Sequence, residues 1–177
     1  MLDDSRFTLN PEITVRPELV EGSPRTDVVA QLADEDATLT FAARLAGVLQ
    51  RGLVIYLHGD LGAGKTTLVR GMLRGLGFAG RVKSPTYTLL ETYDAGGFAL
   101  CHFDLYRLND ADEWEAAGFR DELNGDNIFL IEWPNQAQGL LPPADWDITL
   151  TRADLGRTLT LTAHSALGKS CLSTLLS

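Results

Sequence analysis

The sequence predicts an α/β fold in which a mixed, mostly parallel sheet is flanked by helices and ends in an antiparallel hairpin. A continuous apolar run at residues 53–57 leads through a glycine-rich turn into apolar residues at helical spacing, which is typical of a buried strand joined to a helix. Two segments near the C-terminus instead alternate polar and apolar residues around a short turn. Continuous apolar strands suit the centre of a sheet and alternating strands its margin, so we expect both kinds.

The first part of the chain contains an extension, a strand and a helix in this order. Residues 1–25 carry three prolines, mixed charges and no sustained period, so we expect a loose extension. Residues 28–32 are strand-like, and the acidic residues 34–36 favour the start of a helix. Apolar positions at helical spacing form one face of that helix, which Gly52 separates from the next strand.

The remaining elements follow the glycine-rich turn. The helix after this turn is expected to stop near Gly75, and residues 112–123 are expected to form another helix. Strand-like segments lie at residues 87–92, 99–103, 128–131, 146–151 and 157–163. Residues 164–177 have a weak pattern and are expected to lie outside the core, so the domain is predicted to span residues 26–163.

The glycine-rich turn at residues 59–67 fits the pattern G-x-x-x-x-G-K-[ST], and we call it the phosphate-binding loop. Its glycines let backbone N–H groups close around phosphates, while Lys65 neutralises their charge. The helix that follows points its N-terminal amides and the positive end of its dipole into the loop. These features predict a nucleoside triphosphate site. The residues expected to contact it are Asp60, Leu61, Gly62, Ala63, Gly64, Lys65, Thr66 and Thr67.

Two carboxylates end predicted strands. Asp104 follows the apolar run 99–103, and Glu132 follows the run 128–131. Either lies where a Walker B acid would, at the carboxyl end of a strand beside the phosphate-binding loop. Together with the hydroxyl of Thr66 they are candidates for holding Mg²⁺ and for orienting an attacking water molecule.

Three further features admit more than one interpretation. Residues 84–88, which include Ser84, Pro85, Thr86 and Tyr87, concentrate hydroxyls around a proline; on their own they favour a plain turn before a strand over a switch that senses the γ-phosphate. His58 and His102 flank apolar strands without a second ligand at metal spacing, so packed or hydrogen-bonded histidines are expected. Trp133 is a candidate for the core or for a contact surface.

Length and composition limit the class of protein. With 177 residues, the chain is long enough for one domain but too short for a nucleotide module with a separate substrate domain. No apolar run approaches the ~18 residues of a membrane span, and Asp3 and Asp4 are unlike a signal peptide, so we expect a cytoplasmic protein without membrane contact. Cys101 and Cys171 give neither a disulfide framework nor a metal-ligand spacing.

The net charge of −9 disfavours a broad basic face that grips nucleic acid, so any such role is expected to be indirect. Solubility and contact with a basic partner explain an acidic surface equally well.

The order of four segments resembles the TsaE family, also called YjeE, the bacterial ATPase of the tRNA threonylcarbamoyladenosine pathway. The segments are GDLGAGKTT at residues 59–67, VKSPTYTL at 82–89, HFDLYRL at 102–108 and IEWP at 131–134. The resemblance runs from about residue 34 to residue 163, and the four motifs together are far more specific than any one. It favours the switch interpretation of residues 84–88, which we call the switch segment.

The resemblance implies a P-loop NTPase fold that binds ATP and Mg²⁺ and hydrolyses ATP slowly alone. It also implies work in a complex with TsaB-like and TsaD-like proteins, which place threonylcarbamoyl on tRNA, while ATP hydrolysis resets the complex between turnovers. Contact with tRNA would then be indirect. The resemblance places Thr66 and Glu132 in the Mg²⁺ region, Asp104 as a Walker B-like acid and Trp133 beside the site as an essential residue. It implies that Glu35, Thr38, Gly156 and Arg157 border the adenine.

Two departures from the family pattern and two alternative functions remain. The N-terminal extension has no counterpart in typical short members, and Trp114 stands where an aliphatic residue is usual. One alternative is a small-molecule kinase, although the sequence lacks an Arg-rich lid segment. The other is a binding module that is gated by nucleotide and whose hydrolysis is incidental.

Overall fold

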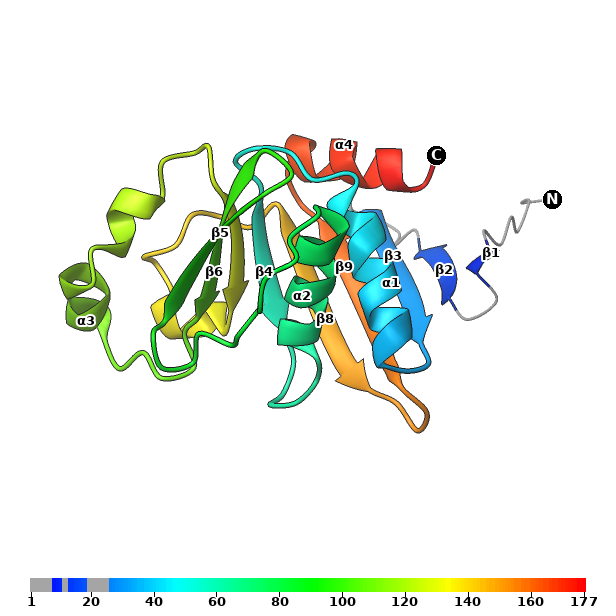
Figure 1. The fold of residues 1–177 in the computed structure, drawn as a ribbon, viewed down its shortest axis with the longest axis horizontal. Coiled ribbons are helices and arrows are strands. Elements are labelled where there is room, and N and C mark those ends of the chain that lie inside the picture. The colour runs from blue at the N-terminus through cyan, green and yellow to red at the C-terminus, as the bar shows by residue number, and fades with distance from the viewer. Residues whose placement is uncertain (1–7, 11–12, 19–25) are drawn as a thin grey trace.

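The structure, a computed structural model, describes residues 8–10, 13–18 and 26–177. Within these ranges nine strands form one sheet in the order β1-β2-β3-β9-β8-β4-β7-β6-β5 (Figure 1). The strands are β1 (Thr8–Asn10), β2 (Ile13–Glu18), β3 (Thr26–Leu32), β4 (Val54–His58), β5 (Leu90–Ala95), β6 (Phe98–Asp104), β7 (Ile128–Glu132), β8 (Trp146–Arg152) and β9 (Arg157–Ala163). The helices are α1 (Glu35–Ala46), α2 (Lys65–Gly75), α3 (Ala111–Ala116) and α4 (Ala166–Leu175), with 3₁₀ turns η1 (Phe119–Glu122) and η2 (Pro134–Ala137). None of the helices in the described ranges has the length and apolar character needed to cross a membrane.

Parallel strand pairs occupy the centre of the sheet. β4 runs parallel to β7 and β8, and β7 runs parallel to β6. β8 and β9 pair antiparallel, which confirms the predicted hairpin. Antiparallel pairing extends further than the sequence predicts, because β3 joins β9 and β5 joins β6. The predicted fold class, a mixed sheet flanked by helices, is therefore confirmed, with antiparallel margins on both sides.

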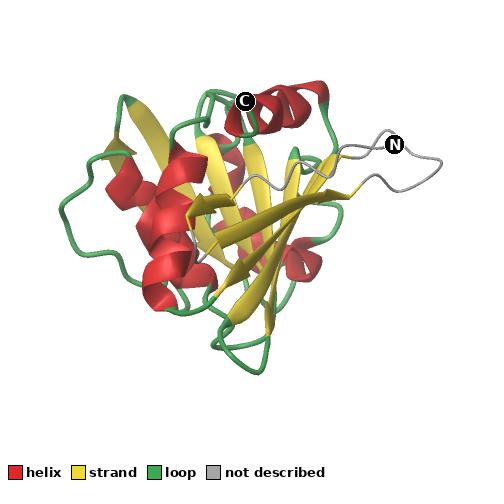
Figure 2. Ribbon diagram, turned by 90° about the vertical axis from the view of Figure 1, so that its right-hand side faces the viewer, coloured by secondary structure: helices red, strands yellow, loops and turns green. Residues whose placement is uncertain are grey.

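Each face of the sheet has its own apolar core. Ile55 and Leu57 belong to the core under α1 and α2, the two helices that Figure 2 shows stacked against one face of the sheet. Phe103 and Ile131 alternate onto the opposite face and pack with Trp114 of α3. The ring centroids of Trp114 and Phe103 are 5.7 Å apart, and Trp114 is completely buried. The tryptophan that departs from the family pattern is therefore a core residue.

The carboxyl ends of β4, β6 and β7 meet at one edge of the sheet. Asp104 of β6 lies opposite Glu132 of β7, and Glu132 lies opposite Leu57 of β4. The phosphate-binding loop leaves β4 beside both acids and leads directly into α2. Open α/β sheets bind their ligands at such an edge, so the fold itself brings the predicted site residues together.

Helices α1 and α2 pack closely because glycines line their contact. Asp34 caps α1 as its acidic start predicts, and its Oδ1 accepts a hydrogen bond from the N–H of Ala37 at 2.8 Å. On α2, a Cβ atom at Gly71 would lie 2.5 Å from the Cβ of Ala42 in α1. The missing side chain at Gly71 thus lets the two helix backbones approach.

Replacing Gly71 by alanine is expected to destabilise the fold. The added methyl group meets α1, and overpacking of this kind costs about 1–3 kcal/mol. The better helix propensity of alanine offsets about 1 kcal/mol, so urea unfolding should show a net loss of up to about 2 kcal/mol. Gly47→Ala is the matched control, because Gly47 has a right-handed φ of −66° and its nearest contact is 3.3 Å away. Equal stability of the two variants would contradict the close-packing explanation.

Two predicted elements differ from the structure. The strand predicted at residues 87–92 begins only at Leu90, because Leu89 has a left-handed φ of 63° that turns the chain out of the extended conformation. The helix predicted at residues 112–123 is interrupted: α3 stops before Gly118, whose φ of 71° separates it from η1.

The two ends of the chain also differ from the sequence predictions. The prediction that residues 164–177 lie outside the core was wrong, because Cys171 and Leu172 of α4 are completely buried in the core under α1 and α2. Trp146 anchors this helix through a 2.8 Å hydrogen bond from its Nε1 to the carbonyl of Gly168. In the predicted N-terminal extension, β2 pairs with β3, while residues 1–7, 11–12 and 19–25 lie outside the described residues. The predicted domain limits stay a prediction.

Candidate functional site

A pocket of about 380 Å³ opens where the carboxyl ends of the central strands meet the start of α2. Its walls come from segments far apart in the sequence: the start of α1, the phosphate-binding loop, the switch segment, the ends of β6 and β7, and the start of β9. The lining residues are Glu35, Leu61, Gly62, Gly64, Lys65, Thr66, Thr67, Ser84, Thr86, Asp104, Glu132, Trp133 and Arg157. Most of the residues that the sequence predicts for the site are thus brought together.

The phosphate-binding loop offers backbone amides to the pocket. Gly64, at the N-cap of α2, has a left-handed φ of 106° and makes no side-chain capping hydrogen bond, so the first amides of the helix face the loop without a protein cap. Gly59 has a φ of 138°, and a Cβ atom there would lie 2.5 Å from the carbonyl oxygen of Leu150. Gly64 is therefore required by the conformation of the turn, and Gly59 also by the close approach of β8. The resulting helix N-terminus suits an anion.

Lys65 is held inside the loop. Only 4% of its surface is exposed, and its Nζ donates hydrogen bonds to the carbonyls of Gly59 at 2.6 Å and Asp60 at 3.0 Å. The ammonium also lies 4.5 Å from the ring centroid of Trp133. Burial lowers the pKa of Lys65, while the negative charge of Glu132 and other nearby carboxylates partly opposes this shift. A phosphate in the pocket would therefore meet a partly desolvated cation.

Glu132 ends β7 with one carboxylate oxygen held by two donors. Its Oε1 accepts hydrogen bonds from Oγ1 of Thr66 at 3.1 Å and from Nε2 of His102 at 2.9 Å. The next residue, Trp133, has a left-handed φ of 57°, an uncommon conformation for a bulky side chain. This turn of the backbone directs the indole toward Lys65 and toward Tyr106, whose ring centroid lies 5.0 Å from that of Trp133. Trp133 is thus a wall of the pocket.

Asp104 ends β6 and connects to the switch segment. Its Oδ2 accepts hydrogen bonds from Oγ of Ser84 at 3.1 Å and from Oγ1 of Thr86 at 2.7 Å, and its Oδ1 accepts one from the N–H of Tyr106 at 3.1 Å. The hydroxyls of Ser84 and Thr86 are themselves 2.7 Å apart. A change in the position of Asp104 would therefore alter its hydrogen bonds to the switch segment directly.

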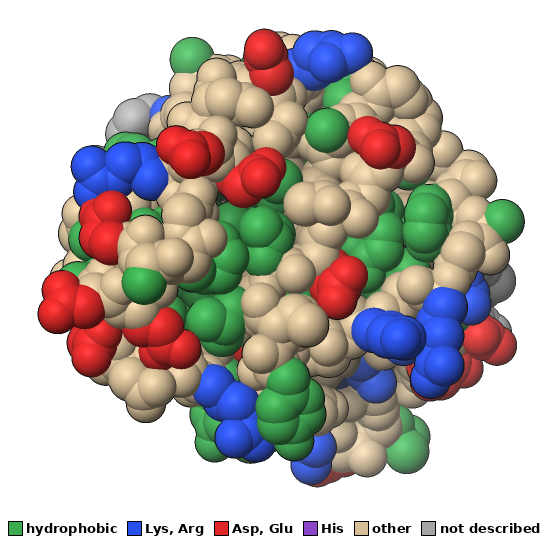
Figure 3. Space-filling model, turned by 60° about the vertical axis from the view of Figure 1, so that its left-hand side comes forward, with side chains coloured by type: hydrophobic (Ala, Val, Ile, Leu, Met, Phe, Trp, Pro, Cys, Tyr) green, Lys and Arg blue, Asp and Glu red, His purple; other side chains and the backbone are tan. Residues whose placement is uncertain are grey.

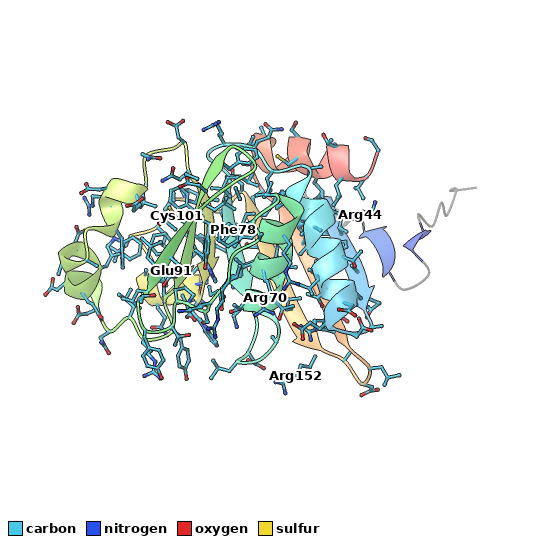
Figure 4. All side chains as sticks on the ribbon, in the orientation of Figure 1. Arg44, Arg70, Phe78, Glu91, Cys101 and Arg152 are labelled. Atoms are coloured by element: carbon cyan, nitrogen blue, oxygen red, sulfur yellow. The ribbon has the colours of Figure 1, made fainter. Side chains whose placement is uncertain are left out.

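The β8–β9 hairpin brings two arginines to the phosphate-binding loop. Arg152 and Arg157 lie opposite each other in the register of the hairpin. A Cβ atom at Gly64 would lie 1.8 Å from Nη1 of Arg157, and one at Gly62 would lie 2.6 Å from Nη2 of Arg152. Figure 4 shows Arg152 beside the loop that joins β4 to α2. Sequence reasoning missed Arg152, although the register around the predicted turn places it opposite Arg157.

Several predicted residues lie near the pocket without lining it. Thr38 is buried and donates a hydrogen bond from its Oγ1 to the carbonyl of Asp34. Gly156 packs against the backbone at the end of β3, and Asp60 and Ala63 line an adjacent hollow beside β8. Tyr87 points outward, with the guanidinium of Arg107 4.7 Å from its ring centroid. The other predicted residue that does not line the pocket is Pro85. The predicted roles of all these residues stay predictions.

The two histidines are hydrogen-bonded, as the sequence predicts. Nε2 of His58 lies 2.8 Å from Oδ1 of Asp147, a carboxylate whose pKa is lowered, against the effect of burial, by His58 and His164. His102 contacts Glu132 inside the protein. Sequence reasoning did not connect His102 with the site, although the two-residue alternation of β6 puts it on the same face as Asp104.

The donor set suits a hard cation. Thr66 offers a hydroxyl oxygen, and Asp104 and Glu132 offer carboxylates on neighbouring strand ends. Mg²⁺ prefers oxygen ligands and is usually held by one or two carboxylates together with substrate phosphates. These three residues are therefore the ones that would hold Mg²⁺ beside a bound triphosphate.

Comparisons with known proteins identify the family of the chain. Residues 32–161 match the family model described as Threonylcarbamoyl adenosine biosynthesis protein TsaE. Among proteins named tRNA threonylcarbamoyladenosine biosynthesis protein TsaE, the one from Haemophilus influenzae is 48% identical over 147 residues, covering 80% of this chain and 93% of the relative. The one from Bacillus subtilis is 38% identical over 129 residues, covering 72% of this chain and 80% of the relative.

A solved structure is similar over most of the fold. The crystal structure of YdiB from Bacillus subtilis superposes with a TM-score of 0.72 at 29% identity, covering 86% of this chain and 94% of that one. This similarity confirms the P-loop NTPase fold that the four sequence motifs imply. Because the family model spans the strands and loops that build the pocket, the chain belongs to the TsaE family.

Proposed function

We propose that the chain binds ATP with Mg²⁺ and hydrolyses it slowly, as a subunit of the assembly that makes threonylcarbamoyladenosine in tRNA. The observation that carries the proposal is the pocket in which Lys65, Thr66, Asp104 and Glu132 meet. Such a combination of a phosphate-binding loop and strand-end carboxylates supplies charge neutralisation, metal ligands and an acceptor for a water proton. The names of the curated relatives support the biosynthetic setting.

Each site residue has a distinct role in this proposal. The loop amides and Lys65 hold the β- and γ-phosphates, which neutralises charge where it develops during transfer. Thr66 and a strand-end carboxylate would hold Mg²⁺, which would supply positive charge to the phosphates. Glu132 or Asp104 orients the attacking water, while Trp133 covers Lys65 and limits the access of solvent. Glu35 and Arg157 border the adenine side of the pocket.

The switch segment reports the nucleotide to a partner in this proposal. Ser84 and Thr86 line the pocket, and their hydroxyls donate hydrogen bonds to Asp104. When Asp104 engages the metal region, these hydrogen bonds must be exchanged, and the segment that carries the exposed Tyr87 moves with them. Nucleotide state thereby changes a surface that other proteins reach.

We place this ATPase in a cytoplasmic complex with TsaB-like and TsaD-like proteins, where hydrolysis resets the complex between turnovers. On the face shown in Figure 3, acidic side chains are spread over much of the surface, and Lys and Arg side chains lie in separate groups around its margin. A net charge of −9 disfavours a broad grip on tRNA, so contact with tRNA is indirect.

Mixing experiments test this setting. ATP turnover of the purified chain should be slow alone and should rise on addition of TsaB-like and TsaD-like proteins together, because the complex completes the site. The measurement is phosphate release with Mg²⁺ and again with excess chelator, which should abolish it. Each partner added singly is the control. An unchanged rate with both partners would contradict the proposal, and a phosphorylated metabolite as product would favour a small-molecule kinase.

A further inference from the structure

His102 is a fully buried titratable residue to which the mechanism above gives no task. It lies on β6 opposite Leu130 of β7, on the face of the sheet that also carries Leu100 and Asp104. It does not line the pocket, so it cannot touch a nucleotide there. Its polar contact is with Glu132, whose Oε1 lies 2.9 Å from its Nε2.

This contact indicates which ring nitrogen of His102 donates to Glu132. An ionised carboxylate accepts hydrogen bonds and has none to donate, so Nε2 of His102 carries the proton that Glu132 accepts. Nδ1 is buried and has no hydrogen-bond partner among the described residues. A proton on Nδ1 would be a buried donor without an acceptor, which costs free energy, so the geometry favours a proton on Nε2. His102 thus presents one directed donor to Glu132.

The hydrogen bond holds one oxygen of Glu132 and leaves the other for the pocket. Thr66 and His102 both donate to Oε1. Oε2 accepts no hydrogen bond from the described residues, and Glu132 lines the pocket. The hydroxyl of Thr66 can offer a lone pair to a metal while it still donates its proton to Glu132. Binding a metal would, however, shift the position of this hydroxyl. His102 is the donor that stays fixed in the sheet.

We propose that His102 is a positioning residue that fixes Oε1 of Glu132 so that Oε2 faces the metal and the attacking water. This inference rests on the proposed ATPase function and assigns a role to a residue outside the pocket. Partners that orient ligands from outside a metal site typically change affinity or activity by about 10- to 100-fold when they are lost. His102 acts through Glu132 and does not itself touch the nucleotide.

A matched pair of amides tests the proposal. The amide nitrogen of glutamine is as many bonds from the backbone as Nε2 of histidine. The amide nitrogen of asparagine is nearer to the backbone and matches the position of Nδ1. His102→Gln should therefore keep kcat for ATP within about fivefold of wild type, while His102→Asn should lower kcat by about 10- to 100-fold with KM for ATP nearly unchanged. Leu100→Val, on the same face of β6, is the packing control and should lower only the melting temperature.

Several outcomes would overturn the proposal. They are an asparagine variant with wild-type kcat, equal losses in both amide variants, or an equal loss of kcat in Leu100→Val. If His102→Asn does not fold, His102→Phe fills the space without a donor and should show the same loss of kcat.

A double-mutant cycle tests whether His102 acts through Glu132. In a Glu132→Ala background, His102→Asn should lower the single-turnover rate of ATP hydrolysis by no more than about twofold, because the carboxylate that His102 positions is gone. A further large loss would mean that His102 acts by another route and would overturn the proposal. A wild-type chain that hydrolyses no ATP with its partners contradicts the proposed function instead, so the two failures are distinct.

Discussion

Replacing Lys65 by alanine is expected to abolish ATP hydrolysis, with a loss of about 1000-fold or more. The ammonium lies inside the phosphate-binding loop, where it donates to the carbonyls of Gly59 and Asp60, and burial has removed much of its hydration. Its charge is therefore available to phosphates at a low local dielectric, where it is worth far more than in water. Steady-state phosphate release measures the loss of hydrolysis. Titration with a fluorescent ATP analogue measures the loss of ATP binding.

The fold should survive the Lys65 substitution. The side chain donates its hydrogen bonds to two carbonyls of its own loop and lies outside the apolar cores, so a melting temperature within a few degrees of wild type is expected. Lys169→Ala in α4 is the matched control, because it changes the net charge equally at a position remote from the pocket. Full activity of the Lys65 variant would sink the ATPase proposal, as would an equal loss in the Lys169 variant.

Glu132→Gln should lower hydrolysis by about 100-fold or more while ATP still binds. Glutamine keeps the shape of the side chain, and its carbonyl oxygen can still accept hydrogen bonds from Thr66 and His102. The substitution therefore removes the charge, and with it the metal ligand and proton acceptor, with little change in packing. Pre-steady-state phosphate release and equilibrium binding of ATP separate the two effects.

Asp104→Asn is the comparison that decides which acid orients the water. Asp104 accepts hydrogen bonds from Ser84 and Thr86, so its amide variant should also disturb the switch segment. If Asp104→Asn loses kcat with unchanged affinity while Glu132→Gln loses only affinity, the two roles are exchanged. If tRNA modification continues at the wild-type rate in a Glu132→Gln chain that cannot hydrolyse ATP, the protein is a nucleotide-gated binding module.

The parts of the fold that sequence alone predicts are those fixed by local rules. The phosphate-binding loop depends on glycines at a fixed spacing, and the strand ends at Asp104 and Glu132 follow from apolar runs that stop at a carboxylate. The hairpin follows from alternation around a turn, and the helix start at Asp34 follows from its capping side chain. Each signal lies within a few residues of the feature that it predicts.

The parts that escaped prediction depend on contacts between distant segments. The link from His102 to Glu132 and the approach of Arg152 to Gly62 arise only when strands pair, and a sequence carries no local mark of strand order. The C-terminal segment has a weak sequence pattern, yet Cys171 and Leu172 are buried in the core and Trp146 anchors their helix. The strand predicted at residues 87–92 starts late because Leu89 has a left-handed backbone conformation. A leucine gives no sign of this conformation in the sequence.

The contact between the hairpin and the phosphate-binding loop affects how variants of this loop should be interpreted. A methyl group at Gly64 would collide with the guanidinium of Arg157, and one at Gly62 would collide with the guanidinium of Arg152. Glycine substitutions would thus displace the side chains of Arg152 and Arg157 as well as alter the phosphate-binding loop, and their phenotypes would mix two causes. Lys65 makes no such contact with the hairpin, so it gives a cleaner genetic test of nucleotide dependence in a living cell.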